Sequence, residues 1–80
     1  MISVEPVREF ILDNFLFGDE NGFNKQTSFV QEGIIDSIGM MELIDFLETH
    51  YDIKIEDSEL VPENLDSLSS IQTFISGKKD

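Results

Sequence analysis

Few residues of this chain are equipped to do chemistry of their own. It contains one histidine, His50, and no cysteine, so thiol nucleophiles, zinc knuckles and disulfide scaffolds are excluded. Seventeen carboxylates are present, but no spacing pairs one of them with His50 or with a nucleophile. We read His50 as an exposed or helix-ending residue. The sequence therefore predicts no catalytic residue and a protein that is not an enzyme by itself.

One acidic stretch has the composition of a calcium loop without its spacing. Asp19-Glu20-Asn21-Gly22 places glycine fourth and Val30 twelfth. An EF-hand requires glycine at the sixth position and glutamate at the twelfth. We expect no resident metal, and keep calcium binding by the acid-rich surface only as a minor alternative.

Ser37 is the serine with the most distinctive surroundings. Asp36-Ser37 stands between a polar segment and an amphipathic one, where a helix is expected to start. Unpaired backbone N–H groups and the positive end of the helix dipole would stabilise a phosphate ester on this hydroxyl. The simpler interpretation is that Asp and Ser are good helix caps and serve no other purpose.

The same dipeptide recurs twice, which provides an internal control. It is found at Asp57-Ser58 and again at Asp66-Ser67, where the next residue is Leu68. Only Ser37 is followed by a helix with a mixed acidic and apolar face. We therefore interpret Ser58 and Ser67 as plain caps.

The charge of the chain restricts its partners. Five basic residues stand against seventeen acids, for a net charge of −12, and eleven of the acids lie between Glu32 and Asp66 with Lys54 as the sole base among them. Such a surface repels nucleic acid and anionic lipid and favours a basic protein, although a charged segment is often only a solvated face. No apolar run approaches the roughly 20 residues of a membrane span. Because the N-terminus also lacks the pattern of a signal peptide, we expect a cytoplasmic protein. We also expect it to be a monomer.

The hydrophobic pattern predicts an all-α domain over residues 1–80, a small bundle of three main helices and one short helix. A first helix, capped by Ser3, carries its stripe to Phe15, and Gly18 ends it. Residues 18–35 form a long loop that we expect to be pinned to the core by its own apolar side chains: Phe23, Phe29, Val30, Ile34 and Ile35. A second helix runs from Asp36-Ser37 to about His50. A short turn over 57–61, a connection from Pro62, and a last helix capped near Asp66 or Ser67 follow.

The second helix has two contrasting faces. Its core face holds five apolar residues at helical spacing: Met40, Leu43, Ile44, Leu47 and Tyr51. The opposite arc alternates acids with large apolar groups: Ile38, Met41, Glu42, Asp45, Phe46, Glu48 and Thr49. Solubility alone does not require Ile38, Met41 and Phe46, so this face is suited to contact with a partner. The alternative is that these three pack beneath the long loop.

Taken together, these features resemble the acyl carrier proteins over essentially the whole chain. The resemblance centres on residues 27–38, TSFVQEGIIDSI, and continues through Glu42-Leu43-Ile44, Leu47-Glu48 and the segment YDIKI at 51–55. The hallmark of that family is Asp-Ser-Leu, whose serine carries 4′-phosphopantetheine through a phosphodiester. The tripeptide is weak evidence alone, but is specific in a small acidic chain with about 36 residues before the serine.

The resemblance implies a role for each matching residue. Ser37 is the expected attachment point of 4′-phosphopantetheine, derived from coenzyme A and added by a phosphopantetheinyl transferase, and Asp36 and Ile38 flank it. Glu42, Glu48 and Asp57 match acids by which such carriers are recognised by basic patches on acyltransferases, synthases and loading ligases, and Met41 belongs with Ile38 to an apolar patch beside the root of the arm. We include Asp45 in the predicted recognition surface, although fatty-acid carriers often have an apolar residue there. The arm would hold an acyl group as a thioester and present it to partner enzymes.

Departures from the family's pattern concern the cargo. Gly33 lies one place earlier than in many fatty-acid carriers, Ile38 replaces leucine, and Gly39 follows, as in D-alanyl and some peptidyl carriers. Phe46 stands where fatty-acid carriers often have a small residue. The resemblance therefore favours a specialised carrier in a lipid, cell-envelope or secondary-metabolite pathway over the carrier of fatty acid biosynthesis, with acyl and aminoacyl cargo both open. The competing hypothesis is an acidic helical adaptor that binds a basic partner without a prosthetic group.

Overall fold

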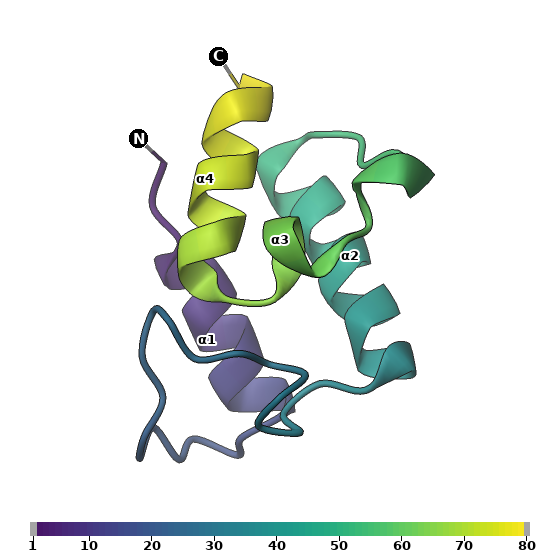
Figure 1. Ribbon diagram of the computed structural model, residues 1–80. Coiled ribbons are helices and arrows are strands. Elements are labelled where there is room, and N and C mark those ends of the chain that lie inside the picture. The colour runs from purple at the N-terminus through teal and green to yellow at the C-terminus, as the bar shows by residue number, and fades with distance from the viewer. Residues whose placement is uncertain (1, 80) are drawn as a thin grey trace.

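The computed structural model describes residues 2–79, and the regular structure within that range is entirely helical (Figure 1). Three long helices, α1 (Glu5–Asn14), α2 (Ser37–Tyr51) and α4 (Leu68–Lys79), surround the core. A 3-10 turn, η1 (Asp57–Glu59), and a short helix, α3 (Pro62–Leu65), connect α2 to α4. The predicted small bundle with one short helix is confirmed. No helix among these residues is long and apolar enough to cross a membrane.

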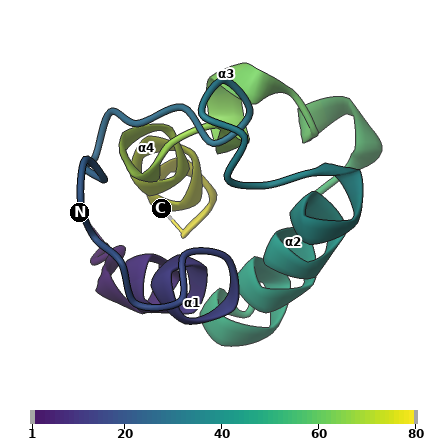
Figure 2. The same ribbon diagram turned by 90° about the horizontal axis from the view of Figure 1, so that it is seen from below.

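The core lies between the three long helices. Seen from below, α1, α2 and α4 are arranged around a common interior (Figure 2). Each long helix contributes two fully buried aliphatic residues: Val7 and Ile11, Leu43 and Leu47, and Ile71 and Ile75. These pairs recur at intervals of four residues, so each helix turns one apolar stripe inward. The predicted core face of the second helix is confirmed at Leu43 and Leu47.

The long loop between α1 and α2 is fastened to the start of α4. Phe29 is completely buried in the core, and its N–H donates to the Asp66 carbonyl at 2.9 Å. The Asp66 carboxylate accepts from the Ser28 hydroxyl and, at 3.0 Å, from the Val30 N–H. The expectation that the loop is pinned by its own residues is confirmed for Phe29 and Ile35. It is wrong for Val30, which is 61% exposed because only its backbone is fixed by Asp66.

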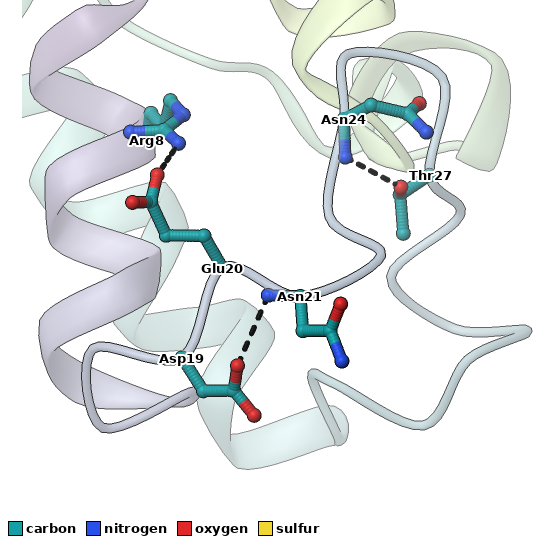
Figure 3. A network of polar contacts seen from close by, with 6 residues as sticks. All are labelled: Arg8, Asp19, Glu20, Asn21, Asn24 and Thr27. Atoms are coloured by element: carbon teal, nitrogen blue, oxygen red, sulfur yellow. Dashed lines mark hydrogen bonds and ion pairs between the residues drawn. The ribbon is translucent and has the colours of Figure 1, made fainter.

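The earlier half of the loop is held by short polar contacts (Figure 3). Arg8 of α1 pairs with Glu20, and the Asp19 carboxylate accepts from the Asn21 N–H at 3.0 Å. The Asn24 N–H donates to the Thr27 hydroxyl at 2.9 Å. These side chains complete turns within the loop, which explains their types without reference to a ligand.

Three element boundaries differ from the prediction, and one of them is the end of α1, which comes at Asn14 instead of near Gly18. The cap position of α1 is Val4, one residue after Ser3, whose hydroxyl still accepts from the Glu5 N–H at 3.2 Å. The segment from Pro62 is helical rather than a plain connection, because proline supplies the φ angle of a first helical residue and lacks an N–H that would be unpaired there. The last helix is capped by Ser67, whose hydroxyl accepts from the Ser70 N–H at 3.1 Å.

Phe46 takes neither of the positions considered for it. It is half-buried at the seam between α1 and α2, where its ring stacks on Phe10 with centroids 4.4 Å apart. His50 stacks on its other side at 5.2 Å. Packing beneath the long loop is therefore wrong for Phe46, and so is its assignment to the partner-facing surface: it joins the first two long helices.

Candidate prosthetic-group attachment site

Ser37 is the first residue of α2, and its side chain is exposed. Asp36 precedes it in extended conformation, and its carboxylate accepts from the Gly39 N–H at 2.7 Å. This capping bond fixes the turn that carries Ser37 and satisfies one of the unpaired amides of the helix start. The hydroxyl therefore faces solvent at the positive end of a fifteen-residue helix, where a phosphate is favoured.

Gly39 lets α1 pack closely behind this turn. A Cβ atom built on Gly39 would lie 2.7 Å from Cε1 of Phe15 and 3.2 Å from both the Asp36 carboxylate and Ile35. Only glycine fits without displacing Phe15 or the cap. The glycine noted two residues after the serine therefore has a packing role that holds the Ser37 turn against α1.

Hollows flank Ser37 on both sides. One is an apolar groove of about 520 Å³, which begins at Asp36 and Ser37 and is formed mainly by Val30, Met40, Met41, Ile44 and Leu60. The other, of about 330 Å³, is more polar and lies among Asp36, Ile38, Glu42 and the end of α1. A group attached to Ser37 would thus have an apolar path toward α3 and a mixed surface on its other side.

The groove is lined on the side of η1 by Leu60 alone. Leu60 follows this turn directly and is 42% exposed. Glu59 accepts from the Lys78 ammonium at 2.8 Å and from the Glu56 N–H at 2.8 Å. The bond from Lys78, and secondarily that from the Glu56 backbone, lowers the pKa of the Glu59 carboxyl. These contacts attach η1 to α4 and hold Leu60 beside the groove.

The predicted recognition residues separate into two groups. Ile38 and Met41 are 70% and 71% exposed, and Glu42, Asp45 and Asp57 are exposed as well. Ile38, Met41, Glu42 and Asp45 share one face of α2, so the structure brings apolar and acidic groups together beside Ser37. Glu48 differs: it is half-buried, and its carboxylate accepts from the Ile55 N–H at 2.9 Å. That bond secures the chain after α2, so Glu48 has a structural task that sequence reasoning missed.

Val30 and Leu60 were also missed as residues of this site. They come from the long loop and from the end of η1, and both expose apolar surface beside Ser37. No spacing along the chain links positions 30, 37 and 60. The apolar type of Val30 predicts a core position instead, which its exposure contradicts.

The internal control is consistent with the distinction drawn from the sequence. Ser67 is only 9% exposed and is occupied as the cap of α4. Ser58 is exposed but lies in the three-residue turn η1, which is too short to provide a helix dipole. Among the three Asp-Ser pairs, only Ser37 combines exposure with the start of a long helix.

Comparison with known proteins identifies the class. Residues 16–75 match the family described as "Phosphopantetheine attachment site". The chain therefore belongs to the phosphopantetheine-binding carrier family: it is a carrier protein rather than an enzyme, and 4′-phosphopantetheine is its expected covalent prosthetic group.

The chain is also similar to individual proteins, of which one is named as a carrier. The chain is 29% identical over 65 residues to the "Probable acyl carrier protein PigG" of Serratia sp. (strain ATCC 39006), a match that covers 81% of this chain and 75% of that protein. It also superposes, with a TM-score of 0.77 and 26% identity, on a chain from a solved structure described as "Crystal structure of FAD-dependent dehydrogenase". That match covers 86% of this chain and 97% of the other, so the two are of similar size.

Proposed function

We propose that Ser37 is the attachment point and that this single carrier domain, residues 1–80, holds an acyl or aminoacyl group as a thioester on its arm. The observation that carries the proposal is the exposed Ser37 hydroxyl at the capped start of α2, within a chain of the phosphopantetheine family. The residues present fit the group: a helix start favours its phosphate, and the apolar groove begins beside the same serine.

The chain's own residues orient the arm and attract its partners. Asp36 fixes the turn that presents the hydroxyl through its bond to the Gly39 N–H. Glu42, Asp45 and Asp57 would draw basic patches of the transferase, the loading ligase and the downstream synthase or acyltransferase by long-range attraction. Ile38 and Met41 would fix the docking register through apolar contact. When bound, the prosthetic group supplies the thiol, which this cysteine-free chain lacks.

For the pathway, we propose a specialised cytoplasmic route rather than bulk fatty-acid synthesis. Gly33 and Gly39 support this, since they depart from the fatty-acid carriers in the direction of D-alanyl and peptidyl carriers. Phe46 supports it because fatty-acid carriers often have a small residue at this place. A solved structure titled as an FAD-dependent dehydrogenase contains a chain of the same size and fold as this carrier, and we therefore propose an enzyme of that class as one of its partners.

The decisive experiment is an intact-protein mass spectrum after incubation with a promiscuous phosphopantetheinyl transferase and coenzyme A. One phosphopantetheine addition is expected on the wild type and none on Ser37→Ala. Ser58→Ala and Ser67→Ala are matched controls, because each removes the serine of another Asp-Ser pair and is expected to accept the full addition. Failure to modify the folded wild type would leave the acidic adaptor without a prosthetic group as the better account.

A further inference from the structure

The apolar groove beside Ser37 continues into a second, smaller pocket. This adjoining pocket measures about 160 Å³ and shares Val30, Met40 and Leu60 with the groove. Val61, Pro62 and Leu65 close its far side. Its one ionisable neighbour is Asp66, whose carboxylate is already bonded to Ser28 and to the Val30 N–H. The Asp66 carboxylate is therefore hydrogen-bonded to the loop, and the other residues that line the pocket are apolar.

The centre of the bundle offers a much less accessible place for cargo. Leu43, Leu47 and Ile71 have no exposed surface, and so fill the space between the long helices. The seam between α1 and α2 is covered by the stack of Phe10, Phe46 and His50. Entry of a chain into the centre would require these groups to move apart, whereas the adjoining pocket lies at the end of an existing groove.

We propose that the adjoining pocket receives the end of the tethered cargo, and that this end is a compact apolar group about the size of one six-membered ring. The size follows from the volume: a cavity of roughly 150 Å³ lined by aliphatic side chains holds benzene, and this pocket measures about 160 Å³. The tether makes occupancy an intramolecular event with a high effective concentration, so a weak apolar contact is sufficient. The proposal rests on attachment of the arm at Ser37.

The test uses carrier protein carrying ¹³C-labelled methionine and leucine methyl groups. Ser37 is loaded by the transferase from acetyl-, benzoyl- or octanoyl-coenzyme A, and each product is verified by mass before its methyl spectrum is recorded. Benzoyl cargo is expected to shift the Met40 and Leu60 methyls relative to acetyl cargo, because an aromatic ring changes the field at nearby protons. The methyl signals of Leu43 and Leu47 in the core are expected to keep their chemical shifts.

Two variants fill the pocket and one serves as their control. Val61→Phe and Leu60→Phe add bulk at the pocket, and both are expected to abolish the benzoyl-dependent shift at Met40. Leu60 is partly exposed, so its replacement does not depend on repacking the core. Thr73→Phe adds the same ring at an exposed position of α4, away from the groove and the hollows beside Ser37, and is expected to leave the Met40 shift unchanged.

The outcomes separate this proposal from the carrier function. Absence of any mass addition on the wild type would overturn both. Full addition with no benzoyl-dependent change in the Met40 chemical shift would show that the cargo is free in solvent. That result would overturn the proposal that the pocket holds the cargo and would leave the carrier function standing. Changes in the chemical shifts of Leu43 and Leu47 with octanoyl or benzoyl cargo would place the cargo in the core. That result would also overturn the proposal that the adjoining pocket holds the cargo. Persistence of the Met40 shift in both filled variants would exclude this location.

Discussion

Two regions of the molecule share almost the same tripeptide and use it in opposite ways. At Asp36-Ser37-Ile38 the aspartate caps α2, while the serine and isoleucine face solvent. At Asp66-Ser67-Leu68 the serine is the cap of α4, the aspartate fastens the long loop, and the leucine is 2% exposed. The second sequence matches the family hallmark more closely, yet its serine is buried. A motif of this length specifies a helix start, and the surrounding packing decides whether its hydroxyl is available.

The largest expected difference concerns the third residue of each tripeptide. Leu68→Ala removes a buried side chain from the core and is expected to lower the free energy of unfolding by about 2–5 kcal/mol. Ile38→Ala, at a 70% exposed position, is expected to change it by less than about 0.5 kcal/mol. Urea unfolding of both variants measures the difference. Equal losses would mean that Ile38 is part of the folded core and not of a docking surface.

A smaller contrast is expected between the two aspartates. Asp66→Ala leaves Ser28 and the Val30 N–H without their acceptor and is expected to lower the free energy of unfolding by about 1–3 kcal/mol. Asp36→Ala removes only a helix cap, with an expected loss of about 1 kcal/mol.

Amide hydrogen exchange identifies which bond is lost in each aspartate variant. Exchange of the Val30 amide is expected to accelerate in Asp66→Ala alone, and exchange of the Gly39 amide in Asp36→Ala alone. Acceleration of both amides in both variants would show that the two segments open as one unit.

The smallest contrast extends the comparison to two acids of α2. Glu48→Ala removes the acceptor of the Ile55 N–H and is expected to lower the free energy of unfolding by about 1 kcal/mol. Glu42→Ala is expected to leave stability unchanged and instead to slow modification by the transferase at low salt, because the exposed carboxylate acts through long-range attraction.

Stability and transferase kinetics, measured on both acid variants at two salt concentrations, distinguish these roles. If Glu48→Ala slowed the transferase as much as Glu42→Ala without any loss of stability, Glu48 would be a docking residue after all.

Two kinds of feature can be predicted from the sequence alone: those that depend on residues three or four apart, and the net charge. The spacing of apolar residues defined the three long helices, the proline-free run from Asp36 defined α2, and the net charge of −12 defined the kind of partner. The Asp36 cap is equally local, since its bond reaches only Gly39. These features follow from helix geometry and coulombic attraction, which need no knowledge of the rest of the fold.

The surroundings of Ser37, by contrast, depend on contacts between segments that are distant in the sequence. Val30 and Leu60 reach the groove because Asp66 fixes the loop and Lys78 holds η1, contacts between segments distant in the chain. The hydrogen bond from the Ile55 N–H to the Glu48 carboxylate and the stacking of Phe46 on Phe10 also depend on how the chain packs. Such contacts arise when helices pack, and a residue's type predicts that it will be buried or bonded without predicting which group will meet it.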